Sequence, residues 1–133
     1  MVAVVCTEEE ITQLVHAFYT SVRRDKILGP IFEHHVDDWD SHLAKLVDFW
    51  SSLLRRTGRF AGTPMPTHIG LPGLSAELFQ RWLTLFRETT AAQPNPLMRE
   101  QANVLAERIA RSLWYGYQLS HHPEAMPDEL THA

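Results

Sequence analysis

Apolar residues recur three and four positions apart in four stretches of the chain, and this spacing predicts α-helices with one buried face. In the first stretch, Ile11, Leu14, Val15, Phe18 and Val22 fall on one side of a helix. We expect helices over about residues 8–24, 39–57, 76–93 and 96–119. Because we find no strand pattern and no internal repeat, the sequence predicts an all-α fold with four main helices.

Each expected helix is preceded by a residue that can cap it. Thr7 opens a capping box before the first helix, and Asp37 or Asp38 can cap the second. Ser75 precedes the third helix, and Asn95 precedes the fourth, which has a proline at its first position. These caps support the expected helix starts independently of the apolar spacing.

Two segments between the helices are unusual. Residues 27–32 are apolar around a Gly-Pro pair, which predicts a turn that packs against the core, followed by a polar connection over residues 33–37. Residues 58–74 are rich in glycine and proline and fit neither a helix nor a strand. A connection of this length inside a domain is usually functional or disordered, and its large apolar residues argue against disorder.

Length and composition predict an ordinary globular chain. The 133 residues suit one domain over 1–133, with a core at about 8–119 and a loose tail over 120–133. The chain is 44% hydrophobic and 21% charged, and its net charge of −4 comes without a basic block, so we expect no nucleic-acid partner. No segment approaches the ~20 apolar residues of a membrane span. The single Cys6 fits a reducing compartment, and we expect a cytoplasmic protein without a membrane partner.

Two histidines are the first candidates for chemistry. His42 lies on the apolar face of the second expected helix, and His68 lies in the loop stiffened by prolines. Tyr19 and Trp82 lie on or beside the buried faces of other helices, and each carries a donor that needs a partner when buried. For His68 the alternative is a solvated side chain, and for the other three it is core packing with a backbone hydrogen bond.

The known metal and catalytic motifs narrow the choice of cofactor. The sequence has no CxxC or HExxH motif, no two Glu-x-x-His motifs that could pair, no phosphate-binding loop and no Gly-x-Ser-x-Gly elbow. One prosthetic group does fit an apolar pocket with a single strong histidine ligand, and that group is haem. The rival class is a helical interaction module without a cofactor, in which the aromatic residues are simply core.

An ordered set of residues resembles the third group of the truncated haemoglobins over about residues 8–117. No short motif in the set is diagnostic alone, and the order and spacing carry the resemblance. The glycine pairs typical of the first two groups are missing. The set comprises Phe18-Tyr19, Val22-Arg23, Leu28 to Phe32, Trp39 with His42, Phe49-Trp50, Gly62 with Pro64 and His68, and Phe79 with Trp82-Leu83.

The resemblance implies a two-over-two helical sandwich around haem b, iron protoporphyrin IX. It implies that His68 is the proximal iron ligand and that Tyr19, Trp82 and His42 lie on the distal side. Arg59 is a candidate for the haem propionates. The residues that the resemblance places against the macrocycle are Phe32, Leu46, Phe49 and Phe79.

The function implied is reversible binding of O₂ or another small diatomic ligand at ferrous iron, with polar distal stabilisation. The alternative is a haem-based redox catalyst with peroxidase-like or nitric oxide dioxygenase activity, which would need an unidentified reductase. The sequence does not separate these functions, and it leaves the oligomeric state open.

Overall fold

The computed structural model describes residues 5–60 and 74–130, and these ranges contain helices and no strand. The all-α prediction is therefore confirmed for this part of the chain. The described helices are α1 (Glu8–Arg24), α2 (Leu28–His35), α3 (Trp39–Arg55), α5 (Ala76–Ala91) and α6 (Pro96–His121). None of them is long and apolar enough to cross a membrane.

The expected caps start four of these helices. Thr7 and Glu10 form the capping box of α1, in which the Thr7 N–H donates to the Glu10 carboxylate at 2.9 Å and the Glu10 N–H donates to the Thr7 hydroxyl at 3.1 Å. Asp38 caps α3, Ser75 caps α5 and Asn95 caps α6. Each cap satisfies backbone N–H groups that have no partner within their helix.

The segment expected to be a turn and a polar connection is instead the helix α2. The Asp25 carboxylate accepts hydrogen bonds from the N–H groups of Ile27, at 3.1 Å, and Leu28, at 2.9 Å, just before the first turn of this helix. Pro30 lies in the first turn, where its missing N–H costs nothing. A Cβ atom on Gly29 would lie 2.7 Å from the Arg23 carbonyl oxygen, so the glycine allows α2 to start directly against the end of α1.

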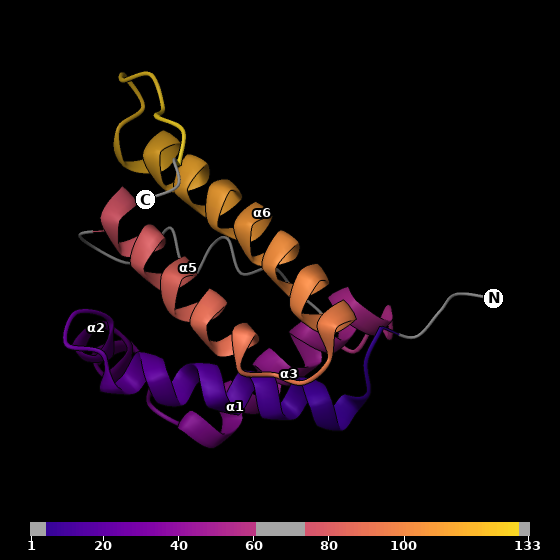
Figure 1. Ribbon diagram of the computed structural model, residues 1–133. Helices are drawn as coiled ribbons and strands as arrows, with labels where there is room; N and C mark the ends of the chain where they lie inside the picture. Colours follow the sequence, from indigo (N-terminus) through magenta and orange to yellow (C-terminus); the bar gives the residue numbers. More distant parts are fainter. Residues whose placement is uncertain (1–4, 61–73, 131–133) are drawn as a thin grey trace.

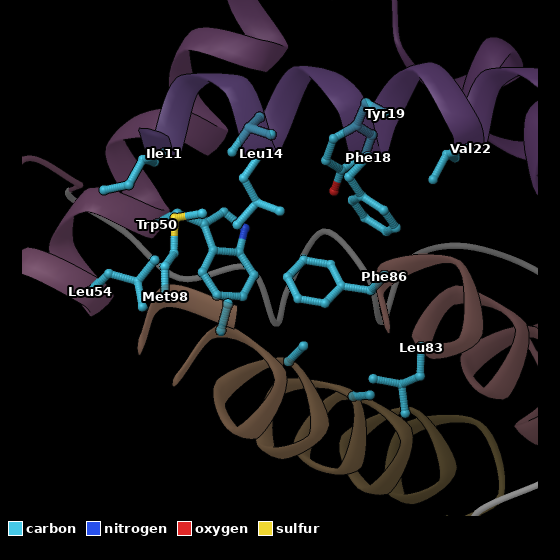
Figure 2. Packing of buried hydrophobic residues seen from close by; sticks show 14 of the residues in the cluster. Ile11, Leu14, Phe18, Tyr19, Val22, Trp50, Leu54, Leu83, Phe86 and Met98 are labelled. Carbon is cyan, nitrogen blue, oxygen red and sulfur yellow. The ribbon is translucent and has the colours of Figure 1, made fainter. Parts of the chain in front are cut away.

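The helices form two layers, with α1 against α3 in one and α5 against α6 in the other (Figure 1). Contacts of α1 with α5, and of α3 with α6, join the layers. Figure 2 shows Leu14 and Phe18 reaching from α1 toward Trp50 and Phe86. The Trp50 and Phe86 rings stack at 5.2 Å, and Phe18 meets Phe86 edge-on at 4.9 Å. Aromatic rings from three helices therefore fill the centre of the sandwich.

The end of α3 and the packing of the C-terminal tail differ from the expectation. Helix α3 ends at Arg55, followed by Arg56 in the left-handed region with φ of 56°, and not near Gly58. The tail after residue 119 was expected to be loose, but its described part is tied to α6. Gln118 donates to the Asp128 carbonyl oxygen at 2.9 Å and accepts from the Asp128 N–H at 2.7 Å. Leu130 is then buried in the core, with 8% of its surface exposed.

Candidate functional site

A cavity of about 310 Å³ lies between the two layers, and residues from all five described helices line it. This volume is in the usual range for small-molecule sites. Among the described lining residues, most are apolar or aromatic, and the polar groups come from few side chains. The lining residues are Tyr19, Leu28, Ile31, Phe32, His42, Lys45, Leu46, Phe49, Trp50, Phe60, Leu74, Leu78, Phe79, Trp82, Ile109, Ala110 and Leu113.

Tyr19 contributes a hydroxyl group to this cavity from α1. The residue is 6% exposed, and it lies at the edge of the buried stripe of α1, one position after Phe18. Burial raises the pKa of Tyr19 well above its usual value, while a hydrogen bond from Trp82 lowers it by a smaller amount. Tyr19 therefore keeps its proton at physiological pH and remains a hydrogen-bond donor.

Trp82 approaches the same hydroxyl group from α5, on the opposite layer. The indole N–H can only donate, so the Tyr19 oxygen is the acceptor in the bond between them. The Trp82 ring stacks on Phe86 at 5.5 Å and meets Phe18 edge-on at 5.2 Å, which fixes its orientation. The preceding residue, Arg81, is anchored to Asp25 by two hydrogen bonds of 2.7 and 2.6 Å.

His42 is the third polar ring on this side of the cavity. It lies in the first turn of α3, where its backbone N–H donates to the Asp38 carbonyl oxygen at 3.0 Å. Its ring meets Tyr19 edge-on at 5.9 Å and Trp39 edge-on at 5.5 Å. The structure thus brings Tyr19, His42 and Trp82 together from three helices; that they form the distal side of a haem site stays a prediction.

The four residues expected to form walls, Phe32, Leu46, Phe49 and Phe79, all line the cavity. That they contact a haem group stays a prediction. Sequence reasoning missed several other lining residues. The apolar residues around the Gly-Pro pair gave a signal that this segment is buried, but not that it faces a site. For residues of α6 no signal existed, because their apolar positions also fit plain core packing. The missed apolar residues are Leu28, Ile31, Trp50, Phe60, Leu74, Leu78, Ile109, Ala110 and Leu113.

The charged residue at the described cavity wall is Lys45, whose side chain is exposed. It follows His42 by three positions on α3 and therefore shares its face of the helix. Arg59, the candidate for a haem propionate, is paired with Glu8 at 2.8 Å, and its contact with haem stays a prediction. Glu8 also accepts hydrogen bonds from Ser51 and Arg55, so Arg59 belongs to a polar cluster that joins the start of α1 to the end of α3.

His68, the candidate iron ligand, lies outside the described residues, between Phe60 and Leu74. Both of these flanking residues line the cavity. The proximal assignment of His68 therefore rests on the sequence.

Comparison with known proteins gives one curated relative and one solved structure. No family model matches the chain. The chain is 37% identical over 105 residues to a group 3 truncated haemoglobin of Campylobacter jejuni subsp. jejuni, and the match covers 76% of this chain and 80% of the relative. The crystal structure of the group III truncated haemoglobin from Campylobacter jejuni superposes with a TM-score of 0.77 at 32% identity. This superposition covers 91% of this chain and 96% of that one.

Sequence identity at this level over most of both chains, together with the same helical arrangement, is the mark of common descent. The protein therefore belongs to the group III truncated haemoglobins.

Proposed function

We propose that this chain binds haem b with His68 as the proximal iron ligand, and that it binds O₂ reversibly in the distal part of the cavity. The observation that supports this function most directly is the polar cluster of Tyr19, Trp82 and His42 at one side of a largely apolar cavity. Membership of a globin family implies the haem group, and the cluster supports the choice of ligand.

The residues present fit a haem group. Its macrocycle needs apolar walls, and the described lining supplies aromatic and aliphatic side chains from every helix. Its charged propionates need a solvent-facing edge, and Lys45 would supply a cation there. When bound, haem supplies a ferrous iron centre that takes a diatomic ligand and places partial negative charge on it.

Tyr19 is the residue best placed to stabilise that charge. Its oxygen already accepts the hydrogen bond from Trp82, so its own O–H is left for an acceptor in the cavity. Trp82 acts on this donor by orienting the hydroxyl group. Because the site is buried, the hydrogen bond to a charged acceptor is stronger than it would be in water. We therefore expect the chain to release O₂ slowly.

The haem proposal is tested by reconstitution. Purified protein titrated with haemin should take up one equivalent and, after reduction, show the Soret band of a histidine-ligated haem protein. His68→Ala should lose that spectrum, and His122→Ala, an exposed histidine at the end of α6, should keep it. A folded wild-type protein that stays colourless would contradict haem binding. A normal spectrum in His68→Ala would contradict the proximal assignment alone.

A further inference from the structure

Trp39 lies behind the polar cluster without lining the cavity itself. Its ring meets His42 edge-on at 5.5 Å and lies 6.2 Å from Tyr19 at a tilted angle. Tyr19 and His42 are themselves 5.9 Å apart. The three rings contact one another pairwise, so Tyr19 and Trp39 both restrict the rotation of the His42 ring.

Of these two neighbours, Tyr19 is the fixed one. It is 6% exposed and packs on Phe18 at 4.9 Å and on Phe32 at 5.8 Å. Trp39 is half-buried and is the first residue of α3. The Asp38 cap holds the backbone there by accepting from the Ser41 N–H at 3.2 Å. The backbone under Trp39 is therefore anchored, and its side chain is the part that can move.

Arg23 is the residue that covers Trp39. The centre of its guanidinium group lies 4.4 Å from the centroid of the Trp39 ring, a cation–π contact between α1 and α3. The Nε atom of the same guanidinium donates to the Glu33 carboxylate of α2 at 2.8 Å. Both charged side chains are close to half exposed, at 45% and 49%. Such a contact is weak and is screened by salt, so it can open and close readily.

We propose that Arg23, held by Glu33, keeps Trp39 against His42 and so limits the rotation of the His42 ring, which sets how fast a small ligand enters the cavity. This inference rests on the proposed function, because it concerns ligand access to the same site. Trp39 is a positioning residue that acts through His42, and Arg23 with Glu33 holds Trp39 at the surface. Arg23, Glu33 and Trp39 together form the latch.

The latch predicts an ordered series of entry rates. Arg23→Gln removes the cation and should speed ligand entry about two- to fivefold, the range for an exposed cation–π contact. Arg24→Gln removes the same charge from the next position, which is exposed, and should change nothing. Trp39→Ala should speed entry more than Arg23→Gln, and Trp39→Phe should restore part of the restriction because it keeps a ring against His42. High salt should speed entry in the wild type and not in Arg23→Gln.

The test is carbon monoxide rebinding to the reduced haem-loaded protein after flash photolysis, measured with each variant in the wild-type and His42→Ala backgrounds. The latch is supported if Arg23→Gln accelerates rebinding, Arg24→Gln does not, and the acceleration disappears in His42→Ala. Equal acceleration in both backgrounds would overturn it, because Trp39 would then not act through His42. No acceleration in either background would also overturn it.

A second readout separates this inference from the proposed function. Side-chain NMR of His42 in the purified protein measures the rotamer averaging of its ring without any bound ligand. Arg23→Gln and Trp39→Phe should both increase that averaging relative to Arg24→Gln, and unchanged averaging would overturn the latch. If the protein takes up no haem while His42 averaging still increases, the proposed function fails and the restriction of His42 by the latch stands.

Discussion

Single polar side chains connect the helices of this protein at places where apolar packing alone does not fix how the helices meet. Asp25 is the clearest case, because one carboxylate accepts from the N–H groups of Ile27 and Leu28 at the start of α2 and also binds Arg81 of α5. Its side chain is 6% exposed. The same carboxylate thus fixes the corner between α1 and α2 and the position of the helix that carries Trp82.

The lowered pKa of Asp25 predicts that the stability of the fold depends on pH. The hydrogen bonds from Arg81 are the largest cause that lowers its pKa, to about 2 from an ordinary value of 3.8. Because the folded pKa is the lower one, the carboxylate stabilises the fold above about pH 4 and loses this effect as the pH falls toward 2. Asp25→Asn keeps an oxygen that can accept from the N–H groups of Ile27 and Leu28, but it loses the charge. The variant should therefore be less stable than wild type at pH 6. This gap should narrow by pH 3 in urea unfolding.

The control for this comparison is Asp37→Asn, which removes an exposed aspartate in the connection between α2 and α3. Its stability difference from wild type should be small at both pH values. A gap for Asp25→Asn that stays constant from pH 6 to pH 3 would show that the charge of Asp25 does not act as described.

Among the helices, α2 depends most on a single close approach. Its second residue, Gly29, lies where a Cβ atom would be 2.7 Å from a backbone oxygen of α1. A backbone atom cannot move aside as a flexible side chain can. Helix α2 carries three cavity-lining residues, Leu28, Ile31 and Phe32, so its distance from α1 affects the wall of the site.

Gly29→Ala should therefore destabilise the protein although alanine favours helices. The helix preference gains about 1 kcal/mol, whereas forcing a methyl group into a packed contact costs more. With an overpacking cost of roughly 1 to 3 kcal/mol, we expect the net free energy of unfolding to fall by up to about 2 kcal/mol in chemical denaturation. Ser21→Ala, at an exposed position of α1, serves as the control. A Gly29→Ala protein as stable as wild type would mean that the contact is not tight.

Helix α2 also shows what the sequence could and could not predict. The capped amphipathic helices were predictable, because Thr7, Asp38, Ser75 and Asn95 act locally on their own N–H groups. A Gly-Pro pair flanked by four large apolar residues resembles a turn locally. Its helical state depends on Asp25, whose carboxylate also binds Arg81, 56 positions along the chain. Pattern reasoning does not see such a distant partner.

In the candidate site, too, local features were predictable from the sequence and contacts between distant segments were not. Tyr19, His42 and Trp82 each stood out as polar rings on buried faces, and the ordered resemblance grouped them. The link from Arg23 through Trp39 to His42 was not predictable, because it depends on how α1 and α3 cross. The ion pair of Arg59 was not predictable either, since its partner Glu8 lies 51 positions away in the sequence.

At the scale of the whole molecule, the two layers are held by aromatic stacking at the centre and by the tail at one edge. Trp50 of α3, Phe86 of α5 and Phe18 of α1 meet between the layers (Figure 2). Beyond α6, Leu130 joins the same core, behind the hydrogen bonds between Gln118 and Asp128. The tail therefore contributes to the stability of the fold.

Leu130→Ala tests this contribution. Removing a buried leucine side chain near a chain end should lower the free energy of unfolding by about 2 kcal/mol, the low end of the range for core leucines. Met126→Ala is the matched control in the same segment, because Met126 is 89% exposed, and it should change stability by less than about 0.5 kcal/mol. Equal effects of the two substitutions in thermal or urea unfolding would contradict a packed tail.

We expect the buried Tyr19 of α1 to donate a hydrogen bond to O₂ held in the cavity. The most direct measurement is the rate of O₂ release from the reduced haem-loaded protein, with Tyr19→Phe compared against wild type. Loss of a hydrogen bond to a charged group costs roughly 1 to 3 kcal/mol, which corresponds to release about 5 to 150 times faster. Tyr115→Phe, at a residue that is 55% exposed, should release O₂ at the wild-type rate. If Tyr19→Phe also releases O₂ at the wild-type rate, Tyr19 is not the donor and the claim is contradicted.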